Sequence, residues 1–117
     1  MALIRASKVN TAEGSCTLKT SGGTASGSYT LSSLTKGKKY LLTSVSAGQS
    51  TDATAKNAVT VSSVSGGSKE TVESPTTTAY SSTRFGHSAY LLTPTSTSMT
   101  ITKGGATWAT YMLFALD

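Results

Sequence analysis

Apolar residues along the chain recur at every second position or in short runs, and clusters of Ser, Thr and Gly separate them. A period of two places successive side chains on opposite faces of a strand, and the Thr, Tyr and Val content of these segments favours strands further. Seven or eight short strands are predicted, within residues 14–19, 28–31, 40–45, 58–61, 89–92, 99–101 and 108–116. The pattern therefore predicts an all-β chain whose residues 1–117 form a single antiparallel β-sandwich, either Ig-like or jelly-roll-like.

The segments between the predicted strands carry turn signals. Residues 35–37 and 102–104 both read Thr-Lys-Gly and lie between two strand candidates. Because Gly supplies a positive φ at low cost, each is predicted to be a hairpin turn. The stretch 62–83 holds few large apolar residues, which indicates a long ordered loop or an edge ribbon.

The last predicted strand, 108–116, is apolar on both faces. Two interpretations remain open, a central strand buried on both sides or a strand with one face in the core and the other against a neighbouring subunit. An antiparallel sandwich strand usually shows one face to water, which keeps the second interpretation in play. The candidate subunit-interface residues are Trp108, Tyr111, Met112, Leu113, Phe114 and Leu116.

The composition offers little chemistry. Hydroxyl side chains dominate, with 20 Ser and 22 Thr, whereas charged residues make up 13% of the chain against roughly 25% in an average domain. His87 is the single histidine, five carboxylates are scattered, and no Gly-x-Ser-x-Gly nucleophile elbow occurs. One Cys and one His cannot build a structural zinc site. We therefore predict no catalytic residue, no metal site, no cofactor and no enzymatic activity.

Positive charge is concentrated in one half of the chain. The net charge is +5, and residues 1–60 carry all of it. Such basic residues either form a merely solvated face or contact an acidic protein partner or an anionic cell-surface polymer. Nucleic acid is disfavoured because few aromatic residues lie among the basic ones. The candidate contacts to an acidic partner are Arg5, Lys8, Lys36, Lys38 and Lys39.

A second possible site lies in 80–90. Sugar sites on sandwiches use exposed aromatic residues beside polar groups, and Tyr80, Phe85, His87 and Tyr90 are close in sequence. The competing interpretation places Phe85 and Tyr90 in the core. Gln49, Asn10 and Asn57 are the only amides, a thin supply of hydrogen-bonding groups for a lectin.

The run from Leu34 to Leu42 is similar to the tyrosine corner of fibronectin type III and related sandwiches, in which a Leu is followed six residues later by a Tyr. The resemblance implies that the Tyr40 hydroxyl is tied to nearby backbone. It supports a sandwich without assigning the chain to that family.

Over its full length the chain resembles the small β-sandwich structural proteins of tailed-bacteriophage particles. The features in common are Ser/Thr/Gly-rich strands, the segment TKGKKYLL, the apolar terminal segment ATYMLFALD, and a Met start without a recognisable secretory signal or membrane span. This resemblance implies a non-enzymatic tail, fibre or capsid-decorating subunit that contacts other virion proteins, forms a homo-oligomer with a trimer favoured, and is assembled in the host cytoplasm.

The alternative to a structural subunit is a receptor- or carbohydrate-binding module at a phage tail tip or a cell surface. A secreted or cell-surface location, such as that of an adhesin, is expected if a signal peptide has been removed from the chain.

Overall fold

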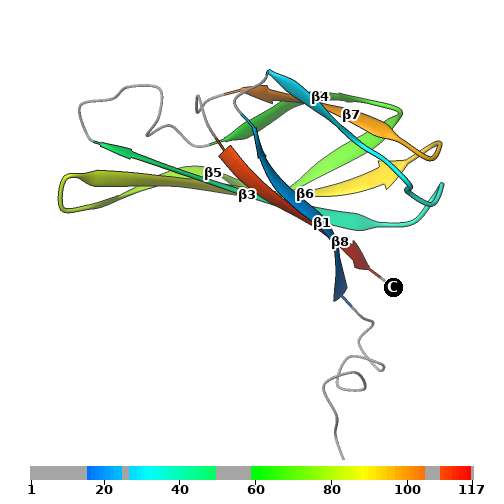
Figure 1. The fold of residues 1–117 in the computed structure, drawn as a ribbon, viewed down its shortest axis with the longest axis horizontal. Helices are drawn as coiled ribbons and strands as arrows, with labels where there is room; N and C mark the ends of the chain where they lie inside the picture. Colours follow the sequence, from blue (N-terminus) through cyan, green and yellow to red (C-terminus); the bar gives the residue numbers. More distant parts are fainter. Residues whose placement is uncertain (1–15, 25–26, 50–58, 105–108, 117) are drawn as a thin grey trace, which may run out of the picture.

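The computed structural model describes residues 16–24, 27–49, 59–104 and 109–116, and these form eight strands in two antiparallel sheets (Figure 1). The predicted all-β sandwich is therefore confirmed. The strands are β1 Cys16–Thr24, β2 Ser28–Leu31, β3 Tyr40–Gln49, β4 Thr60–Ser65, β5 Gly67–Tyr80, β6 Thr83–Pro94, β7 Met99–Gly104 and β8 Ala109–Leu116. The five-stranded sheet has the order β1-β8-β3-β6-β5, and the three-stranded sheet has the order β2-β7-β4.

The pairing of these strands is that of a wrapped hairpin. The chain folds back on itself at the β4–β5 connection, so that β3 pairs with β6, β2 with β7 and β1 with β8. Coiling this long hairpin into two sheets also pairs β8 with β3 and β7 with β4. This arrangement is a jelly roll. Of the two predicted sandwich types, Ig-like and jelly-roll-like, the structure therefore has the second. One strand departs from it, because β5 pairs with β6 in the five-stranded sheet and not with β4.

Both predicted hairpin turns are wrong. Residues 35–37 connect β2 to β3, which lie in different sheets, and residues 102–104 belong to β7. The structure instead has a hairpin between β5 and β6, where Ser81 has a φ of 56°. A Gly with positive φ, such as Gly37 at 81°, marks a change of direction but does not determine which sheet the next strand joins.

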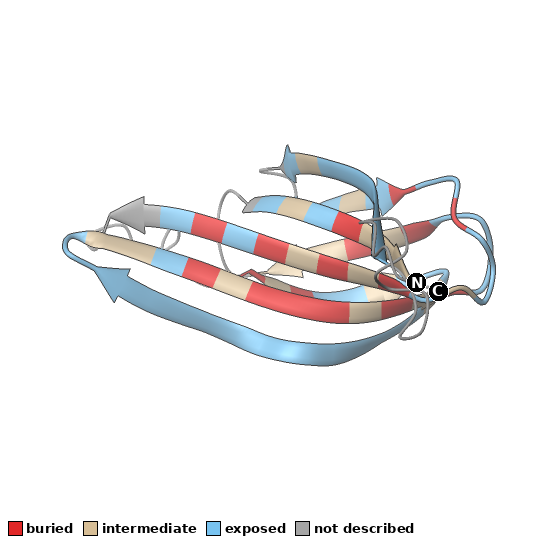
Figure 2. Cartoon of the chain, turned by 90° about the horizontal axis from the view of Figure 1, so that it is seen from below, coloured by how far each residue is buried: buried red, intermediate tan, exposed pale blue. Residues whose placement is uncertain are grey.

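The stretch 62–83 contains the end of β4 and the whole of β5, so the edge-ribbon alternative is confirmed. Gly66 makes the passage between the two sheets with a φ of 83°, and a Cβ there would lie 2.6 Å from the carbonyl oxygen of Ser98. Every residue of β5 after Gly67 is exposed, and the hairpin of β5 and β6 reaches beyond the three-stranded sheet (Figures 1 and 2). Two register shifts against β6, between Thr71 and Thr76, interrupt the regular ladder of this edge strand.

The core lies between the sheets. Leu42, Leu92 and Leu113 of the five-stranded sheet are fully buried, and residues of the three-stranded sheet such as Met99 and Ile101 join them in one cluster. Within the described ranges, no helix is long and apolar enough to cross a membrane.

The tyrosine corner expected from the resemblance is present. The backbone N–H of Thr35 donates a hydrogen bond of 2.8 Å to the Tyr40 hydroxyl, and Leu34 is buried beside it in the core. This contact ties the β2–β3 crossover to the start of β3, so it fixes the point where the chain enters the five-stranded sheet.

Candidate functional site

The five-stranded sheet has one face on the core and a second face, here called the outer face, directed away from it. Strand register sets its composition, because opposite residues of an antiparallel pair project on the same side. Three cross-strand rows fill its centre: Leu18, Phe114, Leu41 and Leu91; then Ser21, Met112, Thr43 and Ala89; then Gly23, Thr110, Val45 and His87. Ala47 and Phe85 begin the next row.

Large apolar side chains on this face are open to solvent. Leu18, Val45, Phe85 and Met112 are between 43% and 54% exposed, and they come from four different strands. The half-buried Leu41, Leu91 and Phe114 lie among them in the register. Figure 2 shows the alternation of buried and less buried residues along β3 and β6 that gives each strand these two faces. The row of Leu18, Phe114, Leu41 and Leu91 is apolar throughout, and the other apolar side chains lie beside polar ones such as Thr43 and Thr110. Exposed apolar clusters mark interaction sites more often than single exposed apolar residues do.

The two faces of β8 behave differently. Met112, Phe114 and Leu116 point to the outer face, where the sequence placed a possible neighbouring subunit. Leu113 is fully buried and Tyr111 packs against the core, so these two interface candidates are core residues and do not reach the outer face. Trp108 lies outside the described residues.

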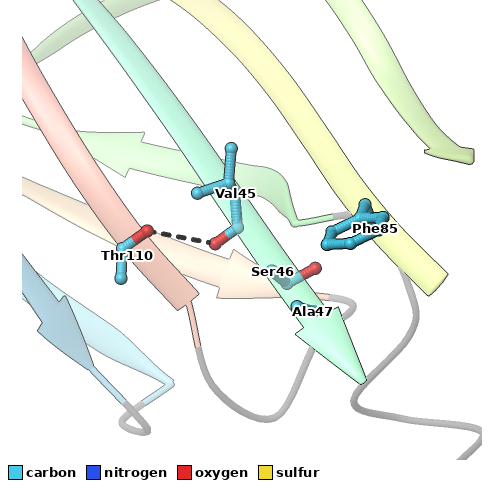
Figure 3. Close-up of a pocket in the computed structure, with 5 residues that line it drawn as sticks. All are labelled: Val45, Ser46, Ala47, Phe85 and Thr110. Carbon is cyan, nitrogen blue, oxygen red and sulfur yellow. Dashed lines mark hydrogen bonds between the residues drawn. The ribbon is translucent and has the colours of Figure 1, made fainter. Parts of the chain in front are cut away.

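An open hollow of about 360 Å³ lies at one end of the outer face, lined by Val45, Ser46, Ala47, Phe85 and Thr110 (Figure 3). The Thr110 hydroxyl donates a 3.4 Å hydrogen bond to the carbonyl oxygen of Val45. The lining is mainly apolar, and this hydroxyl already has a protein acceptor. The hollow therefore suits an apolar group better than a sugar, which needs several hydrogen-bonding partners.

The four candidate ligand residues are divided between the two faces. Tyr80, Phe85 and His87 all belong to outer-face rows, and Tyr80 is 75% exposed. Tyr90 is buried in the core, and its hydroxyl accepts a 3.2 Å hydrogen bond from the backbone N–H of Val61. The competing core interpretation is thus right for Tyr90 and wrong for Phe85.

Carboxylates lie along one edge of the outer face. Among the described residues the acidic side chains are Glu70 and Glu73, which both belong to β5 and lie opposite Leu91 and Ala89 of β6. Glu73 Oε1 is 3.0 Å from His87 Nδ1. The β5 edge of this face is therefore polar and acidic, whereas its centre is apolar.

The basic candidates gather at one connection as far as the structure describes them. Lys36 and Lys38 lie between β2 and β3, and so does Lys39, whose Nζ donates a 2.9 Å hydrogen bond to the Thr93 hydroxyl. Lys39 lies level with the end of β8, because the Leu116 N–H bonds to its carbonyl oxygen. Arg5 and Lys8 lie outside the described residues.

Sequence reasoning missed much of the outer face. The strand pattern assigns Leu18, Leu41, Val45 and Leu91 to strands but to no site. A usable signal was present: Leu41-Leu42 and Leu91-Leu92 put apolar side chains on both faces of β3 and β6, as 108–116 does for β8.

Across the part of the chain that the structure describes, no group of three or more His, Cys, Asp or Glu side chains gathers to hold a metal ion. No family model, curated protein or solved structure matches the chain.

Proposed function

We propose that this protein is a non-enzymatic structural subunit of a bacteriophage particle, in a tail, fibre or capsid-decorating position, and that it acts by protein–protein contact through the outer face. The observation that carries the proposal is the group of large, half-exposed apolar side chains at the centre of that face. Side chains from β1, β8, β3 and β6 leave about half of their surface in water there, although the opposite side of β8, β3 and β6 is packed in the core.

The physical mechanism is burial of sheet against protein. Covering apolar surface contributes about 25 cal/mol per Å², and Met and aromatic residues such as Met112 and Phe85 are enriched at the centres of interfaces. The basic β2–β3 connection, with Lys36, Lys38 and Lys39, would meet an acidic neighbour in the particle. Jelly rolls recur in viral capsid and lectin domains, so the fold is compatible with a virion role by analogy only.

Light scattering behind size exclusion, at low and at high salt, tests the proposal. We expect an assembled species that survives high salt, because apolar burial is screened far less than surface ion pairs. Met112→Lys places a charge in the apolar centre and should yield a folded monomer. Ser63→Lys, an exposed position of the three-stranded sheet, is the matched control and should assemble normally. Wild-type protein that stays monomeric at both salt concentrations would contradict the proposal.

A receptor- or carbohydrate-binding module is the second candidate, and one observation favours it. Tyr80, Phe85 and His87 project on the same face of the five-stranded sheet, near the β5–β6 hairpin. Binding to a glycan array should then be lost in Phe85→Ala and Tyr80→Ala, with unfolding temperatures close to that of the wild type. An array without a bound glycan would remove this candidate.

A further inference from the structure

The two edge strands of the five-stranded sheet carry opposite charge at the same height. Glu70 of β5 is in the row of Leu91, Leu41, Phe114 and Leu18, and Glu73 is in the next row, which ends at Ser21. On β1, at the other edge, the exposed Lys19 lies in the register shift between Leu18 and Thr20. Lys19 therefore lies level with the two carboxylates, with β8, β3 and β6 in between.

The positions of these charges favour one relative orientation of two copies of the chain. Suppose that two copies turn their outer faces toward each other about a symmetry axis parallel to the strands. Each cross-strand row of one copy then lies level with the same row of the other, and β1 of one copy lies beside β5 of the next. Both a two-fold axis and a three-fold axis in this direction have that effect, and both would place Lys19 close to Glu70 and Glu73 of a neighbour. A two-fold axis across the strands would instead set β5 on β5, with carboxylate against carboxylate. Charge therefore favours the axis parallel to the strands.

The size of the face fits such an assembly. The face is five strands wide at about 4.8 Å per strand, and about seven residues long at about 3.3 Å per residue, as from Leu41 to Ala47. Its flat area is therefore roughly 550 Å². Projecting side chains such as Met112 and Phe85 raise the accessible area above this value, toward the roughly 800 Å² per partner of a standard interface. Two sheets also pack well face to face at about 10 Å, as the interiors of sandwiches do.

We propose that the outer face binds a second copy of this chain, with β1 of one subunit beside β5 of the other and Lys19 paired with Glu70. This inference rests on the proposed function, because it names the partner of the same face. Apolar rows supply the affinity, and the edge charges select the orientation of the subunits.

A charge exchange tests the arrangement. Lys19→Glu and Glu70→Lys should each raise the dissociation constant of the assembly about tenfold at low salt, because each sets like charges together in every contact. The double variant restores the attraction with the signs reversed and should return to within about threefold of the wild type. Ser63→Glu, which adds a carboxylate at an exposed position of the three-stranded sheet, is the control and should leave the constant unchanged.

The possible failures are distinguishable. If the wild type assembles and Met112→Lys disrupts it, but the double variant does not recover, the subunits meet through the outer face in another orientation. That result overturns the inference and leaves the proposed function standing. A wild-type monomer at every concentration overturns both. Circular dichroism of each variant shows that a loss of assembly is not a loss of folding.

Discussion

An aromatic stack between Tyr29 and Tyr111 connects the two sheets. Their rings stack with centroids 4.5 Å apart and planes inclined by 14°, one ring from β2 and the other from β8. Gly22 of β1 makes room for this stack, because a Cβ there would lie 2.9 Å from the Tyr111 hydroxyl. Burial raises the pKa of the Tyr29 hydroxyl well above its usual range, the neighbouring Tyr111 raises it further, and a hydrogen bond with Ser44 opposes the shift.

The raised pKa predicts a loss of stability in alkali. Above a pH of about 10, Tyr29 ionises in the unfolded chain but keeps its proton in the folded one. The unfolded state then binds fewer protons, so the free energy of unfolding falls as pH rises. Tyr29→Phe keeps the stack but removes the proton, and its stability should fall less steeply between about pH 9 and pH 11. Urea unfolding at both values measures this slope, and equal slopes for the two proteins would refute the argument.

At the scale of elements, β8 shows why the sequence could predict a two-faced strand without assigning its faces. Its alternating pattern was visible in 108–116, but only pairing with both β1 and β3 shows that Leu113 points to the core and Met112 away from it. The same limit explains the two wrong hairpins, since local turn chemistry does not encode the sheet of the following strand. The sequence of β5 does not distinguish an edge ribbon from a long ordered loop, because this Ser- and Thr-rich stretch lacks an apolar stripe. Tyr40 was predictable because its corner is built from contacts within six residues.

Neighbouring positions of β8 give a matched pair of substitutions. Leu113→Ala removes most of a fully buried side chain. It should lower the free energy of unfolding by about 2–5 kcal/mol, as the same substitution does for other buried leucines. Met112→Ala changes the open face and should cost about 0.5 kcal/mol or less. Chemical unfolding at low protein concentration, where assembly does not contribute, measures both. Similar losses at the two positions would mean that the outer side of β8 is also packed within the monomer.

For the whole molecule, the wrapped hairpin decides what remains on the surface. The three-stranded sheet packs on one side of the five-stranded sheet, and the apolar side chains on the other side stay partly exposed. The charges of β1 and β5 then border those rows at opposite edges. Topology thus produces the proposed assembly surface from strands whose individual sequences look ordinary.

The oxidation rate of Met112 tests most directly whether the outer face is an interface. Met112 lies on that face and is 45% exposed, whereas Met99 is 1% exposed in the core and serves as an internal reference. Dilute peroxide followed by mass spectrometry gives both rates in one sample. In concentrated, assembled protein Met112 should oxidise almost as slowly as Met99, and it should become fast on dilution or in the Val45→Lys variant. Fast oxidation of Met112 at every concentration would contradict an interface on the outer face.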